Sequence, residues 1–260
     1  MMAEISDLLI QKNIRKALIV DDSFDPVPLA SDLAIEAEEW TVFFDDALAE
    51  DYDLMRQVFP AFDAHRIDKL PNIDEFVASL WTSMELFRPE HIGPVFMRYK
   101  SDMETDRKYL DSLVTKLKEF GLECDTAGRA FKAKAADADL VIIDLFLGSG
   151  QDDPAMKASV EGLLEAIGTR RERPPLIILM SRSPQLSEKY TDFRDSSKLY
   201  GSIFRFIQKS ELSNNDKLVR LLTRLANNYQ DSLKLATFFH AWQEGLSNAQ
   251  ERTAALIRKW

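Results

Sequence analysis

The sequence predicts an α/β protein built around a five-stranded parallel sheet. Short apolar runs rich in Ile, Val and Leu recur along the chain, and runs of this length are typical of strands buried on both faces. Stretches with helical periodicity separate them, and strands that alternate with helices form βαβ units with parallel pairing. The five expected strands are residues 16–22, 122–127, 139–146, 176–181 and 202–209.

Helical stretches are expected before and between these strands. A short helix is expected within residues 1–15. Residues 106–120 carry an apolar stripe and are followed by Gly121, which favours a helix end. The stripe consists of Leu110, Leu113, Val114, Leu117 and Phe120. Three further helices are expected at residues 130–138, 160–170 and 187–200.

Residues 23–105 form a long acidic segment between the first strand and the helix at 106–120. The segment has 18 acidic and 6 basic residues, so it is more negative than the whole chain, whose net charge is −10. Prolines separate helical stretches expected at residues 29–39, 45–59 and 73–87. We expect its acids to form a solvated helical face, with a binding surface as the alternative. We expect its aromatic residues to form a small core of their own, from Trp40, Phe43, Phe44, Phe59, Phe62, Trp81, Phe87 and Phe96.

Residues 213–260 are expected to be helical to the end of the sequence. Apolar residues follow one another at steps of three and four from Leu218 to Leu256, and Gly245 is a position where the helix could break. We interpret the stripe as internal packing, with the seam of a homodimer as the alternative.

The composition argues against several classes of protein. A net charge of −10 and a pI near 4.9 do not fit general affinity for nucleic acid, which requires a basic surface. No apolar run approaches the roughly 20 residues of a membrane-spanning helix, and residues 1–10 lack the basic region of a secretory signal. Cys124 is the only cysteine and the three histidines are scattered, so neither a disulfide nor a zinc cluster is expected. These features predict a cytoplasmic protein.

Charged and hydroxyl side chains stand where four of the apolar runs end. Asp21 and Asp22 follow the first run, Asp144 the third, Ser181 the fourth and Lys209 the fifth. Because the carboxyl ends of parallel strands meet at one edge of a sheet, these side chains are expected to converge. Three close carboxylates repel one another unless a cation is present. The sequence therefore predicts a site for a divalent cation and a phosphoryl group.

In these segments the chain resembles the receiver domain of two-component response regulators. The resembling segments occur in the family's order and are LIVDDS (18–23), DLVIIDL (139–145), IILMS (177–181) and FIQK (206–209). Residues 110–127 are also similar to the family's first helix and second strand. The resemblance implies a flavodoxin-like fold with strand order 2-1-3-4-5. It also implies the domain organisation: residues 1–22 and 106–212 as the receiver domain, 23–105 as a helical insertion, and 213–260 as C-terminal helices or a connector.

The resemblance further implies a role for each residue of the site. Asp144 would be the nucleophile that accepts the phosphoryl group. Lys209 would neutralise the phosphoryl oxygens, Ser181 would donate a hydrogen bond to one of them, and Phe206 would be the switch aromatic. Mg²⁺ would be held by Asp21, Asp22, Asp144 and the backbone carbonyl of Phe146.

Three features depart from the family's pattern. The first is the insertion of about 80 residues, which replaces a short loop and must begin and end beside the acidic pocket. The second is a polar loop expected at residues 149–159, which would lie near Asp144 and change access to it. The third is Ser210, which stands where the family has a proline after the lysine, so the local loop is expected to differ.

Together these observations predict an atypical response regulator receiver. A histidine kinase or phosphotransfer protein would phosphorylate Asp144, and the output would pass through protein contacts or a downstream effector. The chain would be a phosphoacceptor that catalyses its own phosphorylation and dephosphorylation rather than a conventional enzyme. The alternatives are a phosphorylation-independent scaffold and a phosphate sink. A small phosphohydrolase is disfavoured because Phe146 occupies the position where such enzymes carry a second aspartate.

Each residue taken alone also has an ordinary structural interpretation. An Asp pair such as Asp21-Asp22 is typical of a helix cap or a turn, and a serine in the position of Ser181 often caps the next helix. A lone Lys209 would normally be a surface cation, and Phe206 would normally belong to the core. Only their joint arrangement favours a phosphoryl site.

Overall fold

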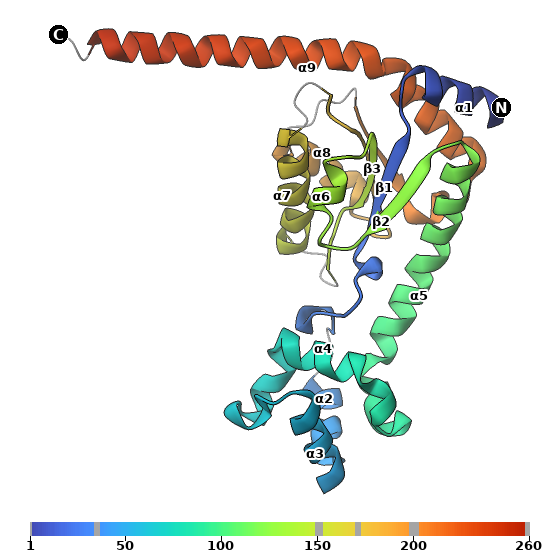
Figure 1. Ribbon diagram of the computed structural model, residues 1–260, viewed down its shortest axis with the longest axis vertical. Coiled ribbons are helices and arrows are strands. Elements are labelled where there is room, and N and C mark those ends of the chain that lie inside the picture. Colours follow the sequence, from blue (N-terminus) through green and yellow to red (C-terminus); the bar gives the residue numbers. More distant parts are fainter. Residues whose placement is uncertain (1, 34–36, 149–152, 170–172, 198–202, 258–260) are drawn as a thin grey trace.

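The computed structural model describes residues 2–33, 37–148, 153–169, 173–197 and 203–257. Its centre is a five-stranded sheet in which every pairing is parallel, in the order β2-β1-β3-β4-β5 (Figure 1). The strands are β1 Lys16–Val20, β2 Glu123–Ala127, β3 Leu140–Asp144, β4 Leu176–Ser181 and β5 Phe204–Gln208. The α/β class and the five-stranded parallel sheet expected from the sequence are thus confirmed. This strand order is the one found in flavodoxin-like sheets.

The central strands are buried because helices cover both faces of the sheet. Every residue of β3 and β4 is buried, as expected for strands made only of large apolar residues before their polar ends. Three helices, α6, α7 and α8, lie on one side in Figure 1, and α5 and the first part of α9 lie on the other. The bounds of these helices are α5 Pro89–Glu119, α6 Lys132–Ala135, α7 Asp153–Thr169, α8 Leu186–Ser196 and α9 Asn215–Ile257. A short N-terminal helix, α1 Met2–Gln11, packs against α9.

The residues between β1 and the sheet-facing part of α5 form a helical body with a separate hydrophobic core. Its helices are α2 Ala37–Asp45, α3 Ala49–Val58 and α4 Asp74–Thr82. Seven of the eight aromatic residues named above are buried in this core, and Trp81 packs against it half-buried. The expectation of a small aromatic core is therefore confirmed. The helix expected at residues 29–39 is wrong over its first part, because Ala30–Asp32 is a single 3-10 turn; residues 34–36 lie outside the described residues, and 37–39 belong to α2.

Helix α5 joins the two cores and is much longer than expected. It begins at Pro89 rather than near Asp106, because Pro89 occupies the first helical position and Pro94 is tolerated inside the helix. Its first part contributes Ile92, Val95 and Phe96 to the insertion's core, and its second part contributes Leu110, Leu113 and Leu117 to the core around the sheet. One continuous helix of 31 residues therefore runs from one body to the other (Figure 1).

Two further expectations about local structure are wrong. The polar loop expected at residues 149–159 is helical from Asp153 onward, since α7 begins there; residues 149–152 lie outside the described residues. Gly245 does not break the C-terminal helix, because α9 is continuous over 43 residues. An isolated glycine lowers the stability of a helix by only about 1 kcal/mol relative to alanine, and the helix-forming residues around Gly245 offset this loss.

Helix α9 has two different halves. Up to Leu233 its apolar residues pack against the body, with Leu218, Leu222 and Tyr229 fully buried. Beyond Leu233 none of the described side chains is buried, and the helix projects well past the body in Figure 1. Within the described residues, no helix combines the length and the hydropathy needed to cross a membrane.

Candidate functional site

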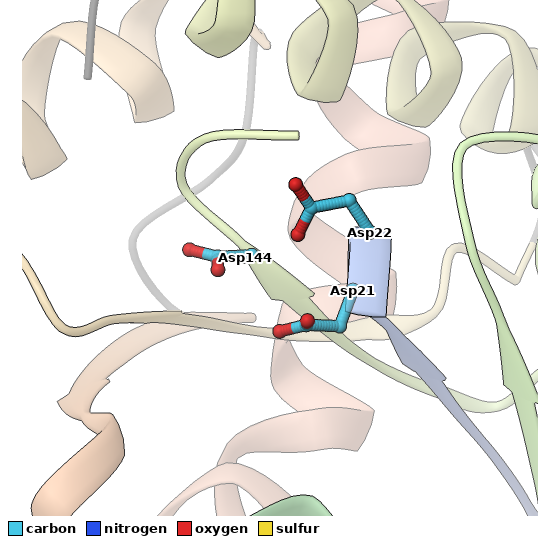
Figure 2. Close-up of side chains that lie close together, drawn as sticks. All are labelled: Asp21, Asp22 and Asp144. Carbon is cyan, nitrogen blue, oxygen red and sulfur yellow. The ribbon is translucent and has the colours of Figure 1, made fainter. Parts of the chain in front are cut away.

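Three carboxylates meet at the carboxyl edge of the sheet, at the junction between β1 and β3. Val20 lies opposite Ile143 in the parallel register, so Asp21 and Asp144 are neighbours where the two strands end. Oxygen atoms of Asp21, Asp22 and Asp144 all lie within 4.8 Å of one another (Figure 2). Asp21 and Asp144 are buried, and Asp22 is partly buried. The convergence of these three residues expected from the sequence is thus confirmed.

Asp21 also performs the capping role that was the ordinary alternative. Its backbone is extended, and its Oδ1 accepts a hydrogen bond of 3.0 Å from the backbone N–H of Ser23, which starts the 3-10 turn Asp22–Phe24. The other oxygen, Oδ2, remains directed toward Lys209. One carboxylate therefore both caps the turn that carries Asp22 and contributes to the cluster.

Lys209 follows β5 directly and is 1% exposed. Its Nζ lies 2.5 Å from Asp144 Oδ2, 2.7 Å from Asp21 Oδ2 and 3.3 Å from Asp106 Oδ1. Burial alone lowers the pKa of Lys209, but the negative charges of Asp144, Asp21 and Asp106 outweigh it and raise that pKa above its ordinary value. The side chain is therefore a permanent buried cation and not a surface lysine.

Asp106 is a member of this cluster that the sequence interpretation did not assign to the site. It lies on α5 and is buried, and its Oδ1 forms ion pairs with Lys209 Nζ at 3.3 Å and with Arg182 Nε at 3.1 Å. Burial raises its pKa, and Lys209 opposes the rise. A signal was available in the sequence, because Asp106 stands four residues before Leu110 and so continues the apolar stripe of the helix with an acid.

A second cation, Arg129, lies on the other side of Asp22. It follows β2 and pairs with Asp25 Oδ2 at 2.8 Å, with Asp22 Oδ2 at 3.4 Å and with Asp32 Oδ1. Asp25 Oδ1 also accepts the backbone N–H of Arg129 at 3.0 Å. The sequence interpretation missed this group, since an arginine in a loop is ordinarily solvated. Through Arg129 the first residues of the insertion are attached to the site.

The electrostatics of the cluster favour the binding of an additional cation. Burial and the neighbouring charges of Asp21 and Asp144 raise the pKa of Asp22 to about 8, although Arg129 and Lys209 oppose the rise. Burial also raises the pKa of Asp144, while Lys209 lowers it. Excess negative charge among hard oxygen atoms matches the preference of Mg²⁺ for carboxylate ligands. Asp21, Asp22 and Asp144 therefore fit a divalent cation by number, chemistry and proximity.

The remaining residues of the predicted site lie at different distances from the carboxylate cluster. Ser181 ends β4, is buried and lines the same cavity as Asp144; its Oγ accepts the Ser183 N–H at 3.1 Å. The Phe146 N–H donates to Asp144 Oδ1 at 3.4 Å. Phe206 lies outside this group: it is 41% exposed and stacks on Tyr190 with ring centroids 4.4 Å apart. The core placement of Phe206 is therefore wrong, and its role as the switch aromatic stays a prediction.

The cluster opens into a cavity of about 140 Å³. Asp144, Ser181 and Lys209 line it from the sheet edge. The insertion supplies other parts of its wall, including Asp32, Leu33, Val95, Arg98 and Tyr99. The expectation that the insertion begins and ends beside the acidic pocket is therefore confirmed. Burial and the charges of Asp32 and Asp22 raise the pKa of Tyr99 to about 12, which keeps its hydroxyl protonated beside the cluster.

Comparisons of this chain with known protein families, with curated proteins and with solved structures found no match.

Proposed function

We propose that the chain is an atypical response regulator receiver whose phosphoacceptor is Asp144. The observation that carries this proposal is the position of Lys209. Its ammonium group bridges Asp21 and Asp144 at the ends of three strands, beside a third carboxylate and inside one cavity. A buried cation next to an acid cluster and a hydroxyl provides the charge neutralisation that phosphoryl transfer requires.

The metal in this proposal is Mg²⁺, held by Asp21, Asp22 and Asp144 with help from the Phe146 carbonyl. When bound, it would supply positive charge to the phosphoryl oxygens. Lys209 supplies positive charge from the protein itself, and its three N–H donors allow it to bond to a phosphoryl oxygen while keeping a carboxylate partner.

The proposed transfer is a displacement at phosphorus. A carboxylate oxygen of Asp144 forms the new P–O bond, and the P–N bond of a phosphohistidine donor breaks. The electron pair leaves with the imidazole nitrogen, which takes up a proton from water. Ser181, whose Oγ now accepts the Ser183 N–H, retains its own hydrogen and donates it to a phosphoryl oxygen. The donor is a histidine kinase or phosphotransfer protein.

The test is the intact mass of the protein after incubation with acetyl phosphate and Mg²⁺. We expect one added phosphoryl group, lost in Asp144→Asn and in the presence of EDTA. Asp125→Asn is the matched control, because Asp125 also lies on a strand but is exposed on β2. A phosphoryl group that persists in Asp144→Asn would contradict the assignment of the acceptor.

A second candidate function is a phosphorylation-independent scaffold. It is favoured by the pairing of Asp22 with Arg129, since a built-in cation already neutralises part of the acid cluster. This candidate predicts no adduct with acetyl phosphate and no change in the protein's spectra with beryllofluoride and Mg²⁺. A phosphate sink, in contrast, predicts an adduct and rapid hydrolysis.

The projecting half of α9 supplies a surface for a partner, which we propose is a second copy of this chain. Leu235, Phe239, Trp242 and Leu246 follow at steps of four, three and four, the spacing of a coiled-coil seam. Leu235, Trp242 and Leu246 are each about half exposed. Residues 231–257 have three acids and two basic residues, so two copies approach there without the repulsion expected between chains of net charge −10.

Light scattering tests this surface directly. We expect a dimer mass for the unchanged chain and a monomer mass for Trp242→Glu. Thr237→Glu, an exposed position on the opposite face of the helix, should leave the dimer intact. A monomer at high micromolar protein concentration would exclude the second copy as the partner.

A further inference from the structure

Asp106 is the residue of α5 whose carboxylate contacts Lys209 at the proposed phosphoacceptor site. Before it, Ile92 and Phe96 belong to the insertion's core; after it, Leu110 and Leu117 belong to the core around the sheet. Its carboxylate is buried between Lys209 and Arg182. Because Asp106 lies between these two parts of α5, a displacement of Asp106 also displaces the helix that connects the two bodies.

Lys209 has three donors and three carboxylate partners in the structure. Two of these contacts are short, 2.5 Å to Asp144 and 2.7 Å to Asp21, and the contact to Asp106 is the longest at 3.3 Å. A phosphoryl group on Asp144 brings further acceptor oxygens within reach of the same ammonium group. One existing contact has to yield, and the longest of the three is the one held least strongly.

Asp106 has an alternative partner when Lys209 withdraws. Arg182 follows Ser181 directly, and its guanidinium lies 3.1 Å from Asp106 and 3.6 Å from Asp102, one helical turn earlier on α5. The end of β4 is therefore attached to α5 by an arginine that faces two acids on successive turns. Two arrangements of these charges are available within the same network, which is what a population shift requires.

We infer that Asp106 is a positioning residue that holds Lys209 at the acceptor site and transmits the phosphorylation of Asp144 through α5 to the insertion. This inference rests on the proposed phosphoacceptor function. In the unmodified protein, the Lys209–Asp106 pair fixes the middle of α5 to the sheet edge. On phosphorylation, Lys209 turns to the phosphoryl group, and Asp106 stays with Arg182. The attachment of the insertion to the sheet is weakened, so the insertion is the element that reports the state of Asp144.

Hydrogen exchange with and without beryllofluoride and Mg²⁺ tests the inference. In the unchanged chain we expect residues 89–105 to exchange at least threefold faster when the phosphoryl mimic is bound. In Asp106→Asn we expect these residues to exchange as fast without the mimic and to show no further increase with it. Asp111→Asn, an exposed acid on the same helix, is the control and should behave like the unchanged chain.

The outcomes separate this inference from the proposed function. A merely structural role for Asp106 would speed exchange in the variant but leave the increment caused by the mimic, and that result would overturn the inference. Equal exchange of residues 89–105 with and without the mimic in a phosphorylatable unchanged chain would also overturn it, while the phosphoacceptor assignment would stand. If the chain accepts no phosphoryl group, both the inference about Asp106 and the proposed phosphoacceptor function are wrong.

Arg182→Gln provides a second variant if Asp106→Asn does not fold. The Arg182 side chain is 40% exposed, so its replacement is compatible with folding. Without Arg182, Asp106 has only Lys209 as partner, and we expect the exchange increment in residues 89–105 to fall at least twofold. An undiminished increment would contradict the role of Arg182 as the partner that Asp106 keeps when Lys209 withdraws.

Discussion

Two buried or half-buried cations each hold three carboxylates on opposite sides of the same site. Lys209 forms ion pairs with Asp21, Asp106 and Asp144, and Arg129 forms ion pairs with Asp22, Asp25 and Asp32. The Lys209 side chain is 1% exposed, whereas that of Arg129 is 21% exposed. The adjacent residues Asp21 and Asp22 thus belong to different charge groups.

The two groups attach the two ends of the insertion. Arg129 joins the loop after β2 to Asp25 and Asp32, near the insertion's first residue, and Lys209 joins the sheet to α5, near its last. The difference in depth matters because a buried charge that loses its partner cannot be compensated by water, while a partly exposed one can. We therefore expect Lys209 and its three carboxylates (the Lys209 group) to contribute most to the stability of the fold. We expect Arg129 and its three carboxylates (the Arg129 group) to act mainly on the properties of the site.

The largest predicted effect is the loss of stability in Lys209→Met. This change leaves Asp21, Asp106 and Asp144 without their common cation, and breaking a buried ion pair in this way costs about 3–5 kcal/mol. Arg129→Gln should cost only about 1–2 kcal/mol, because Arg129 itself and two of its partners, Asp22 and Asp25, are partly exposed. Urea unfolding followed by circular dichroism in EDTA gives both values.

The control for this comparison is Arg107→Gln. Arg107 also lies beside the site, but its Nε donates to the backbone carbonyl of Ser23 and none of its described contacts is to a carboxylate. Millimolar Mg²⁺ should restore part of the stability of Lys209→Met, since it returns positive charge to the same carboxylates. Equal losses of stability in Lys209→Met and Arg129→Gln would contradict the expectation that the more deeply buried cation contributes more to the free energy of unfolding.

The second prediction concerns the pH dependence of Mg²⁺ binding. The pKa of Asp22 is about 8 in the folded chain, above its ordinary value of 3.8, so the folded state retains this proton where the unfolded state has lost it. Without metal, Asp22 therefore lowers the stability as pH rises from about 4 to about 8. Mg²⁺ has to displace this proton below pH 8, and below pH 7 also that of Asp144, whose pKa is raised to about 7. Its affinity should rise about tenfold per pH unit from 7 to 8, more steeply below pH 7, and level off above pH 8.

Calorimetric titrations with Mg²⁺ between pH 6 and 9 measure this dependence. Asp22→Asn should flatten it between pH 7 and 8 and leave the part due to Asp144 below pH 7. Arg129 lowers the pKa of Asp22, so Arg129→Gln should move the plateau to higher pH. A plateau that stays in place in Arg129→Gln would show that the Arg129 group does not act on the metal site.

The sheet and most of the site were predictable from the sequence because both depend on strand ends. Apolar runs such as that of β4 define a buried parallel strand, and the residue after each run has to stand at the carboxyl edge. Asp21, Asp144, Ser181 and Lys209 were located in this way. The parallel register places them together whatever the helices do.

The parts that were not predictable depend on how helices and loops pack. Asp106 enters the site only because α5 crosses the end of β1 and β5 with that residue facing inward. The start of α5 at Pro89 was missed because its prolines indicated breaks in the helix, although a proline at the first helical position is favourable. Arg129 reaches Asp22 from a loop, where sequence periodicity carries no information about side-chain direction.

The last prediction has the smallest expected effect on Mg²⁺ binding, and it disrupts the contacts of Arg129 without changing a charge. A Cβ added at Gly128 would lie 1.8 Å from Asp25 Oδ1 and 3.0 Å from the Asp25 backbone nitrogen, so Gly128→Ala forces the Asp25 side chain away from Arg129. Overpacking of this kind costs about 1–3 kcal/mol. Having lost Asp25, Arg129 should pair more closely with Asp22 and weaken Mg²⁺ binding severalfold. Gly93→Ala is the control, because no atom lies within 4 Å of its added Cβ and alanine favours the helix. Unchanged Mg²⁺ affinity in a destabilised Gly128→Ala would confine the Arg129 group to a purely structural role.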